Sequence, residues 1–302
     1  MFNQSNQRWW AYALPMITVL IWSLNITVTR YVAEFISPIS ISFYRWLIAF
    51  VLMSPFVLLS VWKYRTEIRQ HAWQFALLGA CGMVFYQGLA YSAAHYTTAT
   101  NMGIINAFTP IFTIFISMFI LKEMPTRYAV IGGILSFLGL LYVMSQGNLQ
   151  SLVHLAGHWG DLLMILAVFL YAFYGVFLKK WQIQMPLLTS LYVQIAFALL
   201  FHLPFVFVLG LDVINSQNVG SVLYAGVFPS IVAPLVWMMA VQYIGPNRTS
   251  IFMNVMPIGT ALIAYFWLNE AWTIYHTIGG VIILLGIAVA QRRVEAVGKG
   301  RD

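Results

Sequence analysis

The sequence is dominated by apolar runs of about twenty residues, separated by short breaks that contain charged residues, proline or glycine. A bilayer core takes about 20 apolar residues per helical crossing. Hydrophobic residues make up 61% of the 302-residue chain and charged residues only 8%, which excludes an ordinary soluble fold. The strands of a membrane barrel alternate apolar and polar residues over about ten positions, and these uniform runs are twice that length. The sequence therefore predicts an all-α integral membrane protein.

Ten of these runs are expected to cross the membrane as helices. They span residues 11–31, 39–62, 71–94, 97–121, 127–146, 159–179, 186–210, 219–243, 246–268 and 274–290. The loops between them are short, so no globular domain is expected outside the bilayer.

The basic residues gather at one set of helix ends. Of the 15 Lys and Arg residues, 13 fall on the side of the N-terminus, and only Arg30 and Arg45 lie toward the other. Because cytoplasmic loops carry the excess of Lys and Arg, both termini are expected in the cytoplasm. The net charge of +7 is spread over helix ends and forms no continuous basic face, so no nucleic-acid partner is expected.

The chain contains an internal repeat. Alignment of the chain with itself at a shift of 147 residues gives 16 identities among the 44 positions from Tyr96 to Gly139. Each copy holds five crossings, and because five is odd the second copy must enter the membrane inverted, as in secondary transporters. We expect an N-terminal tail (1–10), a first five-helix repeat (11–146), a connecting loop (147–158), a second five-helix repeat (159–291) and a C-terminal tail (292–302).

Several motifs resemble the EamA-type family of the drug/metabolite transporter superfamily. They are the segment Trp22-Ser23-Leu24-Asn25, the stretch from Pro110 to Glu123, and the pair Gly132-Gly133. The resemblance implies a ten-helix exporter of amino acids or related metabolites in the bacterial inner membrane. It also implies a central cavity lined by the first, third, fourth, sixth, eighth and ninth helices.

Polar and aromatic residues near the middle of these helices are the candidate substrate site. A polar side chain at that depth tends to face the bundle interior or a wet cavity. Amides could bind a carboxylate and an ammonium group, while rings offer stacking and cation–π contacts. The alternative is that the amides join helices and the rings pack. The candidates are Trp22, Asn25, Tyr86, Gln87, Asn106, Tyr171, Tyr174, Trp237 and Asn254.

Four further residues are candidates for gating or structural roles. Pro110 and Pro257 occupy equivalent positions in the two copies, and each is expected to kink its helix and free a carbonyl four residues back. Arg45 could reach outward to the interface, or pair with Glu34 or Asp161 as an outer gate.

Two helices carry glycines at spacings that allow close packing. Gly132 and Gly139 in 127–146, and Gly279 and Gly286 in 274–290, predict that these helices pack on each other or on near neighbours.

The leading hypothesis is a secondary transporter that exports small amphipathic metabolites, amino acids and in particular aromatic ones, by alternating access around a central cavity. The alternatives are a nucleotide-sugar or phosphorylated-sugar exchanger and a lipid scramblase. Catalytic motifs and metal-ligand clusters are not evident, so neither an enzyme, a cofactor nor a metal is expected. The expected partners are a small-molecule substrate and membrane lipid, with the protein a monomer or weak homodimer.

Overall fold

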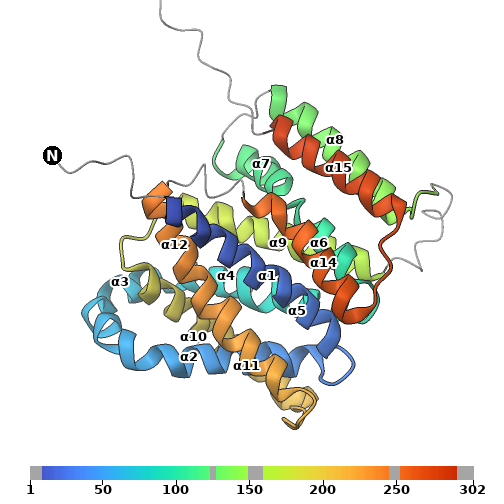
Figure 1. Cartoon of the computed structure of the whole chain (residues 1–302). Helices are drawn as coiled ribbons and strands as arrows, with labels where there is room; N and C mark the ends of the chain where they lie inside the picture. Colours follow the sequence, from blue (N-terminus) through green and yellow to red (C-terminus); the bar gives the residue numbers. More distant parts are fainter. Residues whose placement is uncertain (1–8, 123–126, 149–158, 245–251, 291–302) are drawn as a thin grey trace, which may run out of the picture.

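The computed structural model describes residues 9–122, 127–148, 159–244 and 252–290. Every regular element in these ranges is a helix (Figure 1). In chain order the elements are η1 (Trp9–Tyr12), α1 (Ala13–Val32), α2 (Pro38–Lys63), α3 (Arg65–Gln70), α4 (Ala72–Gly79), η2 (Ala80–Phe85), α5 (Tyr86–Ala93), α6 (Ala99–Asn106), α7 (Thr109–Ile120), α8 (Arg127–Met144), α9 (Trp159–Trp181), α10 (Leu187–Leu209), α11 (Val219–Val227), η5 (Phe228–Val232), α12 (Ala233–Ile244), η6 (Phe252–Val255), α14 (Met256–Leu268) and α15 (Ile274–Ala290).

Six helical segments are long and apolar enough to cross a bilayer. They are Ala13–Val32, Pro38–Lys63, Ala72–Ala93, Trp159–Trp181, Leu187–Leu209 and Val219–Trp237. Two shorter pieces, Ala99–Asn106 and Ile111–Ile120, pass the same test together and are bent by 40° at the break between them. Large apolar side chains on these helices are exposed, such as Phe56 at 81% and Leu59 at 87%, as expected for surfaces that face lipid. The chain is therefore a multi-pass membrane protein, as its composition predicts.

Helices α2 and α10 form a seam in which polar contacts are spaced along an apolar interface. The Ser42 hydroxyl contacts Nε2 of His202 at 2.9 Å near one end, and the Ser60 and Thr189 hydroxyls meet at 2.7 Å near the other. Between them, Trp46, Ala49 and Met53 of α2 are buried against α10 residues such as Ile195 and Ala198. Each of these four side chains has a partner, so none of them adds the cost of an unsatisfied polar group.

The expected crossings 71–94 and 219–243 are each interrupted by a π-helix. Segment η2 separates α4 from α5, and segment η5 separates α11 from α12. A π-helix bonds each residue to the fifth along the chain and so fits one extra residue into a turn. In η5 the Ser230 hydroxyl donates to the carbonyl of Ala225, five residues back, at 2.7 Å. The repeat comparison aligns Gly82 of η2 with Pro229 of η5, and the two π-helices form at equivalent places despite this difference.

The expected crossing 97–121 is two helices rather than one kinked helix. Helix α6 ends at Asn106, and Pro110 lies in the first turn of α7. A proline at that position loses no helical hydrogen bond, because the first N–H groups of a helix have no partner within it. The Asn106 carbonyl, which the sequence predicted to be freed, accepts a hydrogen bond from the Thr109 hydroxyl at 2.6 Å. Pro257 likewise lies in the first turn of α14, directly after the 3₁₀ segment η6.

Helices α8 and α15 lie side by side at one edge of the bundle (Figure 1). A Cβ atom added at Gly139 would come within 2.9 Å of the Gly279 carbonyl oxygen, and one added at Gly286 within 2.6 Å of the Gly132 carbonyl oxygen. The Ser136 hydroxyl donates to the Ile283 carbonyl across the same contact at 3.1 Å. The predicted packing of these two helices through small residues is confirmed.

Candidate functional site

The candidate aromatic residues meet in two groups between the helices. The Trp22 ring of α1 lies 5.5 Å from the Trp237 ring of α12. The Tyr171 ring of α9 lies 4.7 Å from Tyr86 of α5 and 5.4 Å from Tyr174. All five rings are half-buried, and those of Trp22, Tyr86 and Trp237 pack against the main apolar core. The fold therefore brings aromatic rings from four helices into the interior.

The candidate amides have different environments. The Asn25 Oδ1 atom is buried and has no hydrogen-bond partner. The Gln87 side chain is buried, and its Oε1 accepts a hydrogen bond from Arg45 at 2.9 Å. Asn106 ends α6, and its Oδ1 accepts a hydrogen bond from the Thr109 hydroxyl at 3.4 Å. Asn254 belongs to η6, and its side chain lies outside the described residues.

Arg45 is buried in the bundle, with 3% of its surface exposed, and does not reach the interface. Its Nε donates to the Ser230 hydroxyl at 2.9 Å, and its Nη1 donates to Gln87 at 2.9 Å and to the Tyr91 hydroxyl at 3.3 Å. Its guanidinium also lies 4.9 Å from the centre of the Trp46 ring. These contacts tie α2 to both interrupted helices.

The predicted ion pair of Arg45 with Glu34 or Asp161 is wrong. Glu34 pairs with Arg30 one turn earlier in the chain, at 3.6 Å; Glu34 is largely exposed and Arg30 is half-buried. The Asp161 carboxylate accepts hydrogen bonds from the Thr97 hydroxyl and the Asn101 amide. The Arg45 guanidinium instead contacts Ser230 in η5, and Gln87 and Tyr91 in the helix that follows η2.

The two π-helices position the partners of Arg45. Gln87 and Tyr91 follow η2 directly in α5, and Ser230 lies within η5. Gly82 in η2 lets the Tyr174 ring approach, because a Cβ atom there would lie 2.7 Å from that ring. The sequence analysis missed Ser230 and Tyr91. At the repeat shift Pro229 aligns with Gly82, but a local pattern does not reveal which polar side chain a π-helix turns inward.

A second polar cluster lies at the end of the bundle where α1 ends and α2 begins, called the α1–α2 end below. The Glu270 carboxylate accepts hydrogen bonds from the backbone N–H of Ala99 at 2.7 Å, and from the N–H and hydroxyl of Thr100 at 3.0 and 2.8 Å. It therefore satisfies free N–H groups at the start of α6, where the helix dipole favours a negative charge. Next to it, His276 of α15 contacts the Asn101 side chain at 3.2 Å.

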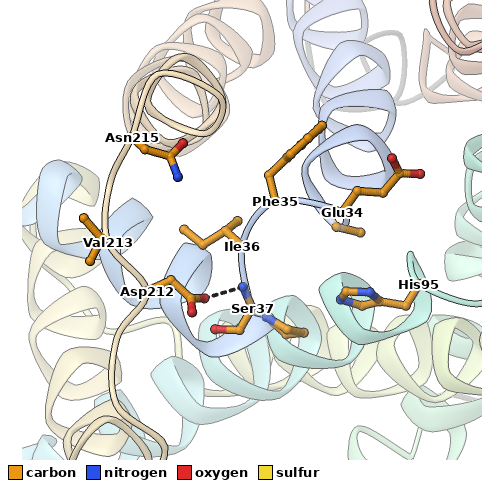
Figure 2. A pocket seen from close by; sticks show the side chains of 10 residues that line it. Glu34, Phe35, Ile36, Ser37, His95, Asp212, Val213 and Asn215 are labelled. Carbon is orange, nitrogen blue, oxygen red and sulfur yellow. Dashed lines mark hydrogen bonds between the residues drawn. The ribbon is translucent and has the colours of Figure 1, made fainter.

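A pocket of about 510 Å³ opens at the same end (Figure 2). It lies between the α1–α2 loop and the α10–α11 loop, which are joined where the Asp212 carboxylate accepts a hydrogen bond from the Ser37 N–H at 2.6 Å. Hydrogen bonds from Ser37 hold the pKa of Asp212 below its ordinary value. Burial, with a smaller effect from Arg30, lowers the pKa of His95 in the pocket wall. At neutral pH the Asp212 side chain is therefore a carboxylate and the His95 side chain an uncharged imidazole, and Glu34 also lines the pocket.

Metal-ligating side chains do not gather in the described ranges: no three His, Cys, Asp or Glu residues there could hold a metal ion together.

Known proteins with similar sequences are transporters by name. The model of the EamA-like transporter family matches residues 9–145 and again residues 158–291. The uncharacterised transporter YyaM of Bacillus subtilis is 26% identical over 268 residues, which is 87% of each chain. An uncharacterised transporter of Archaeoglobus fulgidus is 27% identical over 281 residues, 91% of this chain and 95% of its own.

The fold is also similar to that of a solved protein. A crystal structure with 16% sequence identity superposes with a TM-score of 0.63 and covers 94% of this chain and 98% of the other. At that identity the likeness concerns the fold alone. Because the family model matches both halves and nearly the whole chain, the chain belongs to the EamA-like transporter family.

Proposed function

We propose that the protein exports small amphipathic metabolites, amino acids and in particular aromatic ones, by alternating access around a site in the bundle interior. One observation carries this proposal: aromatic rings from α1 and α12, and from α5 and α9, meet in two groups between the helices, and the Asn25 oxygen of α1 is buried without a hydrogen-bond partner. Buried polar groups without partners are rare unless they serve a function. A substrate with both an apolar and a polar part matches such a lining.

We further propose ten crossings. Three shorter apolar helices, Val130–Val143, Met256–Leu268 and Ile274–Val289, add to the six long segments and the bent pair. Shorter helices can span by local thinning of the bilayer or by extension through residues at their ends. The expected start of the ninth crossing, 246–251, lies outside the described residues.

An inverted repeat accounts for the way the helices pack. At the repeat shift, α1 corresponds to α9, α14 to α7, and α12 to α5. Helix α1 packs on α14 and α12, and α9 packs on the corresponding α7 and α5.

Backbone details support the same correspondence. Lys122 after α7 and Asn269 after α14 are 147 positions apart, and both adopt a left-handed conformation, with φ of 57° and 52°. Such a conformation is uncommon outside glycine, so its recurrence at matched places favours a duplication. The two separate matches of one family model favour it as well.

The distribution of cations predicts that both termini lie in the cytoplasm, and we propose the bacterial inner membrane as the location. A phosphatase fused after Asp302, active only outside the cytoplasm, should stay inactive. The same enzyme inserted in the α10–α11 loop at Asn215 should be active, because that loop lies seven crossings from the N-terminus. Activity of the C-terminal fusion would overturn the topology.

The proposed transport is tested by comparing metabolites exported from cells with and without the protein. Asn25→Ala and Asn106→Ala should lower export of the identified substrate about tenfold or more, while folded protein stays within about twofold of wild type. The reason is that amides lining an aqueous site contribute to binding more than to folding. Gln184→Ala, which removes an exposed loop amide, is the matched control and should export normally. Assembly failure of the Asn25 and Asn106 variants would instead support a role in joining helices.

The alternative functions fit less well. A phosphorylated-sugar or nucleotide-sugar exchanger needs clustered cations for phosphate, whereas Arg45 is the one buried Lys or Arg among the described side chains. A lipid scramblase would favour a polar groove open to lipid over rings gathered between helices. The relatives are named as transporters, and we propose no enzymatic activity. Membrane lipid surrounds the exposed apolar surfaces, and we propose a monomer or weak homodimer.

A further inference from the structure

Three exposed cations lie where α2 turns through α3 into α4, at the end of α2 away from the α1–α2 end (Figure 1). They are Lys63, Arg65 and Arg69, and Glu67 is the one acidic residue of this turn. Arg65 and Arg69 are four positions apart and share a face of α3, whereas Glu67 is two positions from each and faces another way. Among the described residues, no carboxylate forms a salt bridge with any of the three cations. This group of cations is called the α2–α3 basic edge below.

Aromatic rings orient two of these cations. The Arg65 guanidinium carbon lies 4.8 Å from the centre of the Trp62 ring, and its Nη1 donates to the Trp62 carbonyl at 3.0 Å. The Nε and Nη2 atoms of Arg65 make no hydrogen bond with the described residues. The Lys63 ammonium lies 5.6 Å from the centre of the Tyr64 ring. A guanidinium that is already oriented has less side-chain freedom to lose when it binds an anion.

An exposed apolar stripe on α2 leads to this edge. Phe56 and Leu59 are among the most exposed apolar side chains of the protein. Trp62 follows Leu59 by three positions and Lys63 follows it by four, so all of them lie on one face of the helix. Apolar side chains on such a face contact acyl chains, and tryptophan is enriched at the level of the lipid headgroups. A lipid whose chains lie along this stripe places its headgroup beside Lys63 and Arg65.

The end of α9 lies at the same edge. The Trp181 ring of α9 is 5.0 Å from the Trp73 ring at the start of α4. Trp73 is exposed, and Lys180, next to Trp181, is exposed as well. A second exposed tryptophan and a fourth exposed cation are therefore present at this end of the bundle.

The second repeat forms the equivalent turn without positive charge. Pro55 inside α2 and Pro204 inside α10 align these helices at a shift of 149, which pairs Lys63 with Asp212. The connection 210–218 between α10 and α11 contains no Lys or Arg. The turn can therefore form without cations. A topology signal accounts for the number of cations at the α2–α3 basic edge, but not for the ring contacts that orient them.

We propose that the α2–α3 basic edge binds the headgroup phosphate of an anionic phospholipid, whose acyl chains lie along the exposed stripe of α2. Arginine presents paired N–H donors that match phosphate oxygens. The headgroup of a zwitterionic lipid carries its own ammonium group, which offsets the phosphate charge. An anionic headgroup has no such group, so each nearby Lys or Arg adds to its binding. This inference concerns the lipid-facing surface and does not depend on the proposed transport.

The test measures thermal unfolding of the purified full-length protein in an uncharged detergent with added lipid. Phosphatidylglycerol should raise the unfolding temperature at about tenfold lower concentration than phosphatidylcholine with the same acyl chains. The difference should shrink at high salt, because salt screens charges at a surface. Inorganic phosphate alone should have no effect, since it lacks the acyl chains. Equal effects of the two lipids, or stabilisation by inorganic phosphate alone, would overturn the proposal.

Substitutions locate the contact. Arg65→Gln and Arg69→Gln should each raise the phosphatidylglycerol concentration for half-maximal stabilisation about fivefold. Arg65→Lys keeps the charge but loses the paired donors, so it should lose only part of the binding.

Arg127→Gln is the matched control. Arg127 is also exposed, and its guanidinium carbon lies 5.1 Å from the centre of the Tyr128 ring at the start of α8. Its loss removes the same charge and the same kind of ring contact at another place, so phosphatidylglycerol should bind as it does to the wild type. Equal losses in Arg127→Gln and Arg65→Gln would show attraction to the total charge and refute a site at the α2–α3 basic edge. Wild-type binding in both α3 variants would refute it as well.

Discussion

Replacing Gly286 with leucine is expected to abolish most of the folded protein. A Cβ atom at this position would lie 2.3 Å from the Ser136 hydroxyl and 2.6 Å from the Gly132 carbonyl, so α8 and α15 would have to separate. Two helices in lipid associate through close packing and not through the hydrophobic effect. Separation therefore loses the contact itself, and we expect a destabilisation of about 3 kcal/mol or more. The measurement is the yield of monodisperse protein after extraction, together with its unfolding temperature.

The control for this substitution is Gly280→Leu in the same helix. A Cβ atom at Gly280 meets no other atom within 4 Å, so the same change in residue type should have little effect there. Similar yields and unfolding temperatures for the two variants would mean that the α8–α15 contact does not hold the helices together.

Replacing Glu270 with alanine is expected to open the α1–α2 end of the bundle. The substitution removes all three hydrogen bonds that join the α14–α15 loop to the start of α6. Hydrogen bonds to a charged group contribute about 1.5–3 kcal/mol each when buried, so we expect the closed arrangement to lose at least about 1.4 kcal/mol. That loss changes the ratio of open to closed molecules about tenfold. In a Cys81→Ala background, a cysteine at Asn106 should react about tenfold faster with a membrane-impermeant thiol reagent added outside the cell.

Glu34→Gln is the matched control for Glu270→Ala. Glu34 lies at the same end, is largely exposed and pairs with Arg30 alone among the described residues. An exposed pair contributes little, so the reaction rate should be unchanged. An unchanged rate in Glu270→Ala would show that this carboxylate caps α6 without holding the end closed.

The apolar runs predicted the long helices well because their length and composition are local properties. Helices α1, α2, α9 and α10 begin and end within about three residues of the expected limits. The close packing of α8 on α15 was also predictable, because small residues at helical spacing in a membrane helix typically mark a close contact with another helix. Both inferences need only the sequence of one helix at a time.

The interrupted helices were not predictable in the same way. Local sequence gives the same apolar pattern for an α-helix and for a π-helix. In η5 the extra residue is accompanied by the bond from Arg45 to Ser230, whose partners lie 185 positions apart. The break between α6 and α7 was anticipated only as a kink, because Pro110 does not reveal whether the chain continues as one helix or starts a new one.

The candidate site was predicted in its residue types but not in its electrostatics. The rings that were singled out lie in two groups, Trp22 with Trp237, and Tyr86 and Tyr174 with Tyr171, while Gln87 contacts Arg45. Their role in binding a substrate stays a prediction, and the Asn254 side chain lies outside the described residues. The expected partner of Arg45 was wrong because depth along separate helices does not specify which faces are opposed. The role of Glu270 was missed for a similar reason, since two of its three hydrogen bonds come from backbone N–H groups, which do not depend on the side chains of Ala99 and Thr100.

The two seams, α2 with α10 and α8 with α15, have a geometric property that the other contacts lack. Each joins a helix to its own counterpart in the other half, as the Ser136 and Ile283 contact across 147 positions illustrates. In a two-fold arrangement, only elements beside the axis can touch their own counterparts, so the axis of the proposed repeat passes through both seams. A motion that exchanges inward-open and outward-open states by this symmetry converts the α1–α14 contact into the α9–α7 contact and the reverse. The same operation maps each seam onto itself. The contacts within the two seams can therefore stay the same while the remaining helices of each repeat adopt the arrangement of their counterparts in the other.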